Sequence, residues 1–357
     1  MVKIVQEMIL EKIDIKSLSI EDLKKVLENL GEKAFRANQI YEWLHVKLVS
    51  DFEEMTNLSK TLREKLKENC YLTNLTVLNK LESNTGETSK FLFQLKDKNV
   101  LESVLMKYHH GNSVCISSQV GCKMGCKFCA STLDGFERNL TPGEMLDQIY
   151  KIQNISGERV SNVVVMGTGE PLDNLDNLIK FIHIISDEKG LNISQRNITV
   201  STCGLVDKIK ELAEEEMQIT LALSLHAPND TVRRELMPIA IRYDLDTVLA
   251  ACEYYYNKTG RRLTFEYSLV EGVNDLSEYA KELAGRLKGM NCHVNLIPVN
   301  PIKERNYRQS QAKNIQNFKN ILEKYRINVT IRREMGTDID AACGQLRKSY
   351  IDKTMDY

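Results

Sequence analysis

The sequence has no apolar run long enough to cross a bilayer, and its N-terminus lacks the apolar core and cleavage site of a secretory signal. Proline and glycine are scarce, at 6 and 18 of 357 residues, and no low-complexity segment or linker is evident. These absences exclude a membrane-spanning or disordered chain. We therefore expect a globular cytoplasmic protein, in which thiols stay reduced.

An excess of either charge is also missing, because 48 Lys and Arg residues stand against 49 Asp and Glu residues. A chain with this balance has no overall attraction for nucleic acid or acidic lipid. An RNA ligand would have to be bound by shape and by local basic clusters, of which about half are expected to be ordinary surface charges. The candidate basic residues are Arg233, Arg234, Arg261, Arg262, Lys303, Arg305, Arg308, Arg332 and Arg333. No heptad pattern or additional apolar helix face stands out, so we expect a monomer.

The first part of the chain predicts a small helical domain over residues 1–75. Segments 19–30, 35–45 and 59–70 place apolar residues at helical spacing, and Ser19 is a suitable N-cap for the first of them. Alternating apolar residues over 89–108 predict a β-hairpin with KDKN as its turn. Residues 76–111 are expected to form a β-hairpin linker.

From residue 112 the pattern changes to apolar β-branched runs that alternate with helical segments, which is typical of repeated βα units. The expected strands are SVCIS, SNVVVMG, RNITVST, QITLALSLH, LTFEYSLV and CHVNLIPVN, and a further run, INVTIR, follows. About six βα units is short of the eight in a complete barrel. We therefore predict an α/β fold with a partial (β/α)6 barrel over 112–330, open on one side, and a short C-terminal segment over 331–357.

Three cysteines stand close together in QVGCKMGCKFCASTLDGFERN: Cys122, Cys126 and Cys129. A zinc site would need a fourth ligand at suitable spacing, and three unrelated core cysteines would not be expected to cluster in a lysine-bearing loop. A four-iron cluster held by three thiolates leaves one iron open for a small chelating ligand such as S-adenosylmethionine. A CxxxCxxC loop after the first strand of a partial barrel resembles the radical S-adenosylmethionine superfamily.

Polar residues follow several of the predicted strands, where barrel enzymes carry their chemistry. They are Glu170, Ser201, Ser224, His226 and Asn300, and with the adjacent Gly169 and Leu225 they form the candidate cofactor-binding set. A carboxylate such as Glu170 can hold an ammonium group, and Ser or Asn side chains can bind ribose hydroxyls or a carboxylate. The alternative is that these residues cap helices, which is plausible for Ser201 and less so for Glu170. His226 alone would be an ordinary packed histidine.

The remaining cysteines divide into three groups. Cys70, Cys252 and Cys292 are expected to be small core residues, and the role of Cys203 stays open. Cys343 lies in DIDAACGQL, beyond the last strand, where it would either be buried or be reactive. Together with Cys115 it suggests a redox or covalent couple, and the acidic Glu102 lies a short distance upstream.

Several motifs together resemble the family of dual-specificity adenine-C2 methyltransferases that act on 23S ribosomal RNA and transfer RNA, which are radical S-adenosylmethionine enzymes. The motifs are CISSQVGCKMGCKFCAST, VVMGTGEPLDN, SLHAPND, LIPVNP and GTDIDAACGQL. The resemblance covers nearly the whole chain, including the helical N-terminal segment. It implies one [4Fe-4S] cluster on Cys122, Cys126 and Cys129, two S-adenosylmethionine molecules per turnover, and an electron donor such as flavodoxin or ferredoxin.

The resemblance also implies a mechanism with two cysteines. Cys343 takes a methyl group, a 5′-deoxyadenosyl radical removes a hydrogen atom from it, and the methylene radical adds to C2 of an adenine. Cys115 then attacks the sulfur of Cys343, which releases the methylated RNA and leaves a disulfide. Glu102 matches the position of the proton acceptor, and the helical domain matches an RNA-docking module.

Three rival interpretations remain at this point. The first is the related adenine-C8 methyltransferase that confers ribosomal antibiotic resistance and shares these cysteines. The second is an activase that places a glycyl radical on a partner protein, in which Cys115 and Cys343 would have no role. The third is a non-catalytic RNA-binding protein with a structural metal site.

Overall fold

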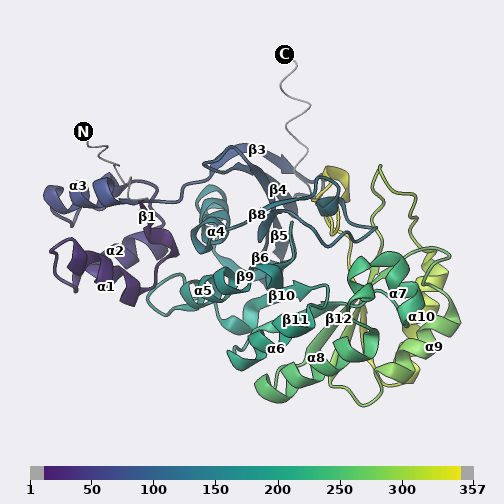
Figure 1. Ribbon diagram of the computed structural model, residues 1–357. Helices are drawn as coiled ribbons and strands as arrows, with labels where there is room; N and C mark the ends of the chain where they lie inside the picture. Colours follow the sequence, from purple (N-terminus) through teal and green to yellow (C-terminus); the bar gives the residue numbers. More distant parts are fainter. Residues whose placement is uncertain (1–11, 347–357) are drawn as a thin grey trace, which may run out of the picture.

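The computed structural model describes residues 12–346. Its centre is a ten-stranded sheet in the order β14-β13-β12-β11-β10-β9-β6-β5-β4-β3, so β3 and β14 are its two edges (Figure 1). The strands are β3 Thr76–Glu82, β4 Thr88–Gln94, β5 Val100–Tyr108, β6 Gly111–Ile116, β9 Val160–Val165, β10 Ile198–Thr202, β11 Thr220–Ser224, β12 Leu263–Leu269, β13 Cys292–Pro298 and β14 Asn328–Ile331.

Strands β6 and β9 to β14 pair in parallel and in chain order. Helices follow β6 and β9 to β13 in turn, which confirms the predicted incomplete (β/α)6 barrel. These helices are α4 Pro142–Ser156, α5 Leu175–Ser186, α6 Val206–Glu214, α7 Asp230–Leu236, α8 Leu245–Thr259, α9 Ser277–Arg286 and α10 Ala312–Lys324. The apolar strand runs are buried between the helices and the barrel interior, as expected for a parallel sheet.

The antiparallel strands β3 to β6 extend the same sheet away from the barrel (Figure 1). The hairpin predicted over 89–108 is present, because β4 and β5 pair with Gln94 opposite Val100. One face of these strands carries Phe91, Phe93 and Leu105, which are buried in the main core. The opposite face carries Lys90, Glu102 and Cys115.

The N-terminal helices are present as predicted: α1 Ile20–Asn29, α2 Arg36–His45 and α3 Lys60–Asn69. Ser19 caps α1 by accepting a hydrogen bond from the backbone of Asp22 at 3.2 Å. The short strands β1 Ile13–Asp14 and β2 Cys70–Tyr71 pair in parallel, so the first and last segments of this unit lie side by side. Residues 1–11 of the predicted domain lie outside the described part of the chain.

The helical unit is fastened to α4 and α5 by buried polar contacts. The Lys16 ammonium lies 2.5 Å from a carboxylate oxygen of Asp147, and both side chains are 1% exposed. Nδ1 of His45 lies 2.7 Å from the hydroxyl of Tyr150. In Figure 1 the unit therefore lies beside the barrel, on the side of α4 and α5.

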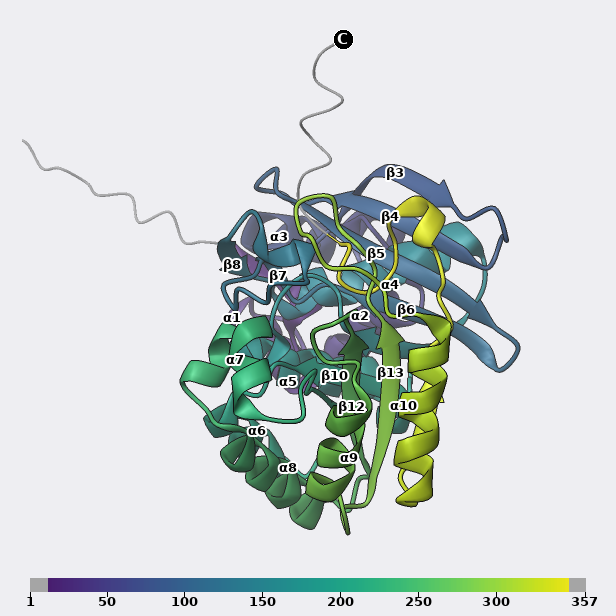
Figure 2. The same ribbon diagram turned by 90° about the vertical axis from the view of Figure 1, so that its right-hand side faces the viewer.

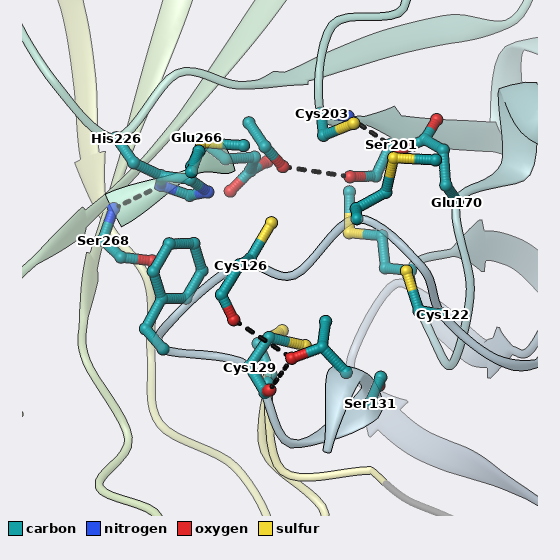
Figure 3. Close-up of a pocket in the computed structure, with 18 of the residues that line it drawn as sticks. Cys122, Cys126, Cys129, Ser131, Glu170, Ser201, Cys203, His226, Glu266 and Ser268 are labelled. Carbon is teal, nitrogen blue, oxygen red and sulfur yellow. Dashed lines mark hydrogen bonds between the residues drawn. The ribbon is translucent and has the colours of Figure 1, made fainter. Parts of the chain in front are cut away.

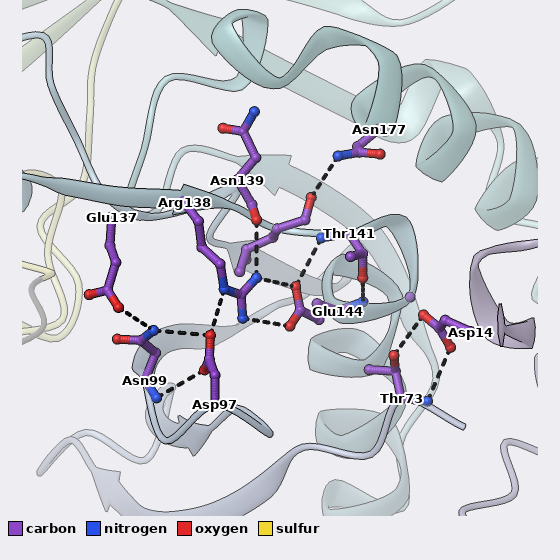
Figure 4. A network of polar contacts seen from close by, with 12 residues as sticks. Asp14, Thr73, Asp97, Asn99, Glu137, Arg138, Asn139, Thr141, Glu144 and Asn177 are labelled. Carbon is purple, nitrogen blue, oxygen red and sulfur yellow. Dashed lines mark hydrogen bonds and ion pairs between the residues drawn. The ribbon is translucent and has the colours of Figure 1, made fainter. Parts of the chain in front are cut away.

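Two short strands that the sequence pattern did not predict, β7 Gln119–Gly121 and β8 Phe136–Asn139, pair as an antiparallel ribbon. The ribbon is fixed by Arg138, whose guanidinium donates to both carboxylate oxygens of Glu144 at 2.8 Å and to Asp97 at 2.6 Å (Figure 4). Glu144 and Thr141 also form a capping box at the start of α4. The loop carried by this ribbon holds the three clustered cysteines.

The C-terminal segment turns back from β14 across the antiparallel strands (Figure 2). Within it, the 3-10 helix η7 Thr337–Ile339 places Asp338 where it accepts hydrogen bonds from the Ser83 hydroxyl and the Asn84 backbone. The ammonium of Lys90 donates to the carbonyl oxygen of Asp340 at 3.2 Å. Residues 347–357 of the predicted segment lie outside the described residues. Over residues 12–346, none of the helices has the length and apolar character that a membrane span requires.

Candidate active site

The cysteine loop is shaped by its own backbone. The amide of Cys122 donates to the carbonyl of Gly135 at 3.0 Å, and the amide of Cys129 donates to the carbonyl of Cys126 at 3.2 Å. At Gly121, φ is +73° and an added Cβ would lie 1.8 Å from the Gly135 carbonyl oxygen, so only glycine allows the two strands to approach. The loop thus holds Cys122, Cys126 and Cys129 on one side of a cavity (Figure 3).

This cavity lies at the carboxyl ends of the parallel strands. Three groups of residues line it: the cysteine loop, the ends of the parallel strands and the C-terminal segment. The predicted site residues among them are Cys122, Cys126, Cys129, Gly169, Glu170, Ser201, Ser224, His226, Asn300 and Cys343. The fold therefore brings together residues that lie far apart in the sequence.

Glu170 is buried and held by backbone donors. Its carboxylate accepts hydrogen bonds from the amide of Cys203 at 2.8 Å and from the amide of Leu172 at 3.1 Å. Burial raises the pKa of Glu170, and these hydrogen bonds oppose that shift. The contact with Leu172 caps the 3-10 helix η4 Pro171–Asn174. Glu170 therefore does cap a helix, although the sequence favoured a binding role for it. Because a carboxylate has further lone pairs, capping does not prevent it from binding a cation.

The preceding residue, Gly169, has φ of +112° and packs directly against Gln119 and Ser118. An added Cβ would lie 2.6 Å from the Cβ of Gln119 and 2.8 Å from the hydroxyl of Ser118. Both the backbone conformation and the space at this position therefore require glycine.

Ser201, Ser224 and His226 line the cavity from β10, β11 and the end of β11. The Ser201 and Ser224 hydroxyls lie 3.4 Å apart, and Ser201 caps no helix, contrary to the alternative considered from the sequence. Leu225, which lies between Ser224 and His226 in the sequence, is fully buried and does not line the cavity. It contributes to the core instead.

The ring of His226 is oriented by its neighbours. Its Nδ1 accepts a hydrogen bond from the backbone of Ser268 at 2.9 Å, and its ring packs edge-on against Phe128. Burial, together with the nearby Arg233 guanidinium, lowers the pKa of His226 to about 3. The imidazole is therefore neutral near pH 7, and with Nδ1 acting as an acceptor its proton lies on Nε2.

Cys343 lines this cavity and also a second, adjacent cavity that contains Cys115. Cys115 lies on β6 opposite Val104 and is 8% exposed. Burial raises the pKa of Cys115 to about 12, and the nearby Cys343 adds to this shift. Both thiols are free, as are all the cysteines, so the disulfide implied by the resemblance is not formed in this structure.

Glu102 does not line either of these cavities. It lies on β5, two residues from Val104 and on the same face of the sheet, at 2% exposure. Its carboxylate lies 3.2 Å from the ammonium of Lys90. Glu102 is therefore close to the Cys115 position along the sheet and separated from the cysteine loop.

One basic residue proposed from the sequence as an RNA contact is instead structural. Arg233 is fully buried and donates to the backbone carbonyls of Cys203 at 2.8 Å and Leu225 at 3.3 Å. Its charge serves to fix the strand ends β10 and β11, so the interpretation of Arg233 as an RNA ligand is wrong.

Sequence reasoning missed three polar residues of the cavity or misread their role. Arg332 lines both cavities, and Glu266 and Ser268 line the first. Glu266 is 3.8 Å from Arg332 and accepts a hydrogen bond from Asn295 at 2.9 Å. A lone acidic residue inside the apolar strand LTFEYSLV was the signal that could have identified Glu266. Cys203, whose role was left open, also lines the first cavity.

The cysteine loop fits an iron–sulfur cluster. Burial raises the pKa of the Cys122 thiol to about 12 and that of Cys126 well above its ordinary value, so these thiols need a cation to become thiolates. No three acidic, cysteine or histidine side chains within residues 12–346 converge as ligands of one metal ion. A cluster does not require such convergence, because each thiolate binds a different iron.

Comparison with known proteins agrees with this geometry. The family model described as the ribosomal RNA large subunit methyltransferase N-terminal domain matches residues 13–72, and that of the radical SAM superfamily matches residues 116–284. A crystal structure of a radical SAM methyltransferase from Sphaerobacter thermophilus superposes with a TM-score of 0.91 at 43% identity, covering 94% of this chain and 99% of that one. The chain is a radical SAM enzyme, a class that uses a [4Fe-4S] cluster and S-adenosylmethionine.

Two relatives narrow this class further. A probable dual-specificity RNA methyltransferase RlmN from Lachnoclostridium phytofermentans is 69% identical over 347 residues, which is 97% of this chain and 98% of that protein. One of the same name from Clostridium novyi is 57% identical, covering 95% of this chain and 98% of that protein. The chain belongs to the RlmN family of radical SAM RNA methyltransferases. This membership rejects the activase and the non-catalytic RNA-binding protein as interpretations.

Proposed function

We propose that this enzyme methylates C2 of an adenosine in 23S ribosomal RNA and of the adenosine next to the anticodon in transfer RNA. Cys343 would carry the methyl group and Cys115 would resolve the covalent intermediate. The observation that supports this most directly is the position of Cys343, which lines both the cavity of the cluster cysteines and the cavity of Cys115. A single side chain can thus meet the cofactor on one side and the resolving thiol on the other.

Cys122, Cys126 and Cys129 would hold the cluster, and the strand ends would hold S-adenosylmethionine. When bound, the cluster and S-adenosylmethionine supply a methyl group and a carbon-centred radical, with two S-adenosylmethionine molecules used per turnover. Glu170, with Gly169 leaving space beside it, would bind the ammonium of the cofactor. Ser201, Ser224 and Asn300 would bind hydroxyl or carboxylate groups, and His226 would donate its Nε2 proton. Leu225 would support Ser224 and His226 from the core.

In the first proposed step, the thiolate sulfur of Cys343 accepts a methyl group from S-adenosylmethionine. After loss of a hydrogen atom, the methyl carbon bonds to C2 of adenine, a carbon that has no lone pair for an ordinary displacement. The adduct then loses the C2 proton and one electron, and this electron would return to the oxidised cluster. Glu102 would accept this proton, a role supported by its buried carboxylate beside the Cys115 position on the sheet.

The resolving step is assigned to Cys115. Its thiolate attacks the sulfur of Cys343, which forms a disulfide and breaks the bond between that sulfur and the new methyl carbon. The methyl carbon keeps the electron pair and takes a proton, so methylated RNA is released. An external dithiol must reduce the disulfide before the next turnover.

The remaining assignments follow from the substrate. We propose that the helical unit, residues 1–75, docks RNA, that residues 76–111 link it to the barrel of residues 112–330, and that residues 331–357 carry Cys343 to the site. The target adenine would be extruded from its stack to reach the cavity. We expect a cytoplasmic monomer that receives electrons from a flavodoxin or ferredoxin.

The test is nucleoside mass spectrometry after an anaerobic reaction of the cluster-loaded enzyme with S-adenosylmethionine, a reductant and a fragment of 23S or transfer RNA. We expect 2-methyladenosine from both RNAs. Detection of 8-methyladenosine would contradict the proposed position and favour the resistance-type enzyme. Cleavage of S-adenosylmethionine without any modified adenosine would contradict the proposed substrate.

A further inference from the structure

The segment that carries Cys343 is hydrogen-bonded directly to the cysteine loop. The backbone amide of Ala130 donates to the carbonyl oxygen of Gly344 at 2.8 Å. The hydroxyl of Ser131 donates to the carbonyl oxygen of Leu346, also at 2.8 Å. Both donors belong to the 3-10 helix η3 Ala130–Thr132, which begins immediately after Cys129.

A third donor holds the same segment from the barrel. The side-chain amide of Asn300 donates to the carbonyl oxygen of Cys343 at 3.0 Å. The carbonyls of residues 343, 344 and 346 are therefore each fixed by a different group. Gly344 has φ of +80° and lies against the carbonyl of Phe128, which allows the segment to approach the loop closely.

The loop side of this contact is held by further hydrogen bonds. The Thr132 hydroxyl contacts the carbonyl oxygens of Cys126 at 3.3 Å and Cys129 at 3.0 Å (Figure 3). Ser131 is 6% exposed, and its hydroxyl also contacts the thiol of Cys129. One serine thus touches both the third cluster cysteine and the backbone beyond Cys343.

We propose that Ser131 is a positioning residue for Cys343, so that the loop that binds the cluster also sets the position of the methyl-accepting thiol. The inference rests on the role of Cys343 in the proposed function. Group transfer to sulfur depends on the alignment of donor and acceptor, and a displacement of about 1 Å is enough to slow such a step by about a hundredfold. Binding the cluster and presenting Cys343 are then coupled through one short helix.

The other end of the C-terminal segment offers a matched control. There Ser83 donates to Asp338 at 2.9 Å, and the Asn84 amide donates to the same carboxylate at 2.8 Å. Ser83→Ala removes one hydrogen bond to this segment but leaves the contacts of residues 343–346 intact. It therefore separates a general loss of anchoring from a loss at the Cys343 end.

The experiment compares the cluster-loaded wild type with Ser131→Ala, Ser131→Thr and Ser83→Ala. Hydrogen exchange of peptides covering 341–346 reports on the position of the segment without any turnover. Mass spectrometry of the peptide containing Cys343 gives the rate of methyl transfer from S-adenosylmethionine, and iron content reports on the cluster. In Ser131→Ala we expect exchange about tenfold faster and methyl transfer about tenfold slower, as for the loss of one buried hydrogen bond, with unchanged iron content. Ser131→Thr should restore both values, and Ser83→Ala should match the wild type at 341–346.

Unchanged exchange and methylation in Ser131→Ala would overturn the proposal. Loss of iron in this variant with unchanged exchange at 341–346 would also overturn it, because Ser131 would then act on the cluster and not on the Cys343 segment. If the wild type itself carries no methyl group on Cys343, the proposed function fails while the exchange measurement still tests the contact.

Discussion

At the scale of single residues, the site depends on atoms whose positions are set by the backbone around them. Glu170 is held by the amides of Leu172 and Cys203, and His226 is oriented by the amide of Ser268. Such pre-positioned groups bind a cofactor without reorganising first. The two side chains that we propose to react, Cys343 and Cys115, are placed by different elements and share only the second cavity.

The first prediction concerns these two thiols. Cys115→Ala should accumulate RNA covalently bound to the protein, at no more than one RNA per chain, because the step that breaks the bond to Cys343 is missing. Cys343→Ala should give neither methylated RNA nor the covalent product. Denaturing electrophoresis with labelled RNA and nucleoside mass spectrometry measure both outcomes. Free methylated RNA from Cys115→Ala in wild-type amounts would falsify the two-cysteine mechanism.

The second prediction concerns Gly169. Gly169→Ala should destabilise the protein by about 2 kcal/mol or more, since the Cβ clashes with Gln119 and the backbone conformation disfavours alanine. It should also weaken S-adenosylmethionine binding, because Glu170 is displaced. Gly285→Ala is the control: its position in α9 has open space, so a gain of about 0.5 kcal/mol is expected. Thermal unfolding and equilibrium binding give both values, and equal stabilities for the two variants would contradict this account.

At the scale of elements, polar contacts decide how the parts of the molecule are joined. The ribbon of β7 and β8 is fixed through Arg138 (Figure 4). The helical unit is fixed to α4 through Lys16 and Asp147. The Asp147 carboxylate also accepts a hydrogen bond from the backbone amide of Leu75 at 2.7 Å, where the chain leaves the helical unit. A buried ion pair of this kind specifies one arrangement of two units, because each charge needs the other.

The third prediction tests this ion pair. Asp147→Ala should destabilise the protein by about 3–5 kcal/mol, since it leaves the Lys16 ammonium buried without a partner. The double variant Lys16→Met and Asp147→Leu should recover most of that loss, because no charge then remains buried. Urea unfolding of the single and double variants measures the coupling. Equal stabilities of Asp147→Ala and the double variant would show that the pair does not hold the units together.

At the scale of the whole molecule, the sheet stays open between β14 and β3, and the helical unit lies beside the barrel (Figures 1 and 2). An open barrel leaves room for a substrate far larger than the cofactor. The joint between the two units includes a buried neutral histidine, His45, which is fully buried against Tyr150. This position makes the stability of the whole assembly depend on pH.

The fourth prediction follows from that histidine. Burial, with the nearby Lys16 ammonium, lowers the pKa of His45 to about 3 from 6.5. The unfolded chain therefore takes up a proton below pH 6.5 that the folded chain does not, so stability falls as pH decreases toward 3. Between pH 7 and pH 5 this loss is about 2 kcal/mol.

The measurement is urea unfolding followed by the fluorescence of the single tryptophan, Trp43, which lies in α2 of the same unit. His45→Gln should lose about 2 kcal/mol less than the wild type over this pH range. The exposed His183→Gln is the control, because its side chain stays in water, and it should follow the wild type. An identical pH dependence of His45→Gln and wild type would contradict the burial argument.

Local patterns in the sequence were sufficient to predict the elements and most of the polar residues that line the first cavity. Strand and helix periods predicted the (β/α)6 order, and the spacing of Cys122, Cys126 and Cys129 singled out the loop that lines the cavity, because these properties depend on neighbours along the chain. The predictions that failed depend on distant contacts. Arg233 is an example: its charge suggested a surface ligand, whereas the fold buries it against the carbonyls of two strand ends.

What only the tertiary structure decided is which of these residues meet. The sequence separates Cys115 from Cys343 and places Ser131 far from Leu346, and no period or spacing relates them. Their proximity follows from the order of strands in one sheet and from the return of the C-terminal segment across it (Figure 2). The sequence by itself determined the chemistry available to this protein, since reactive groups are properties of residues. The packing of the chain decided their geometry, because contacts between distant segments form only when the core is buried.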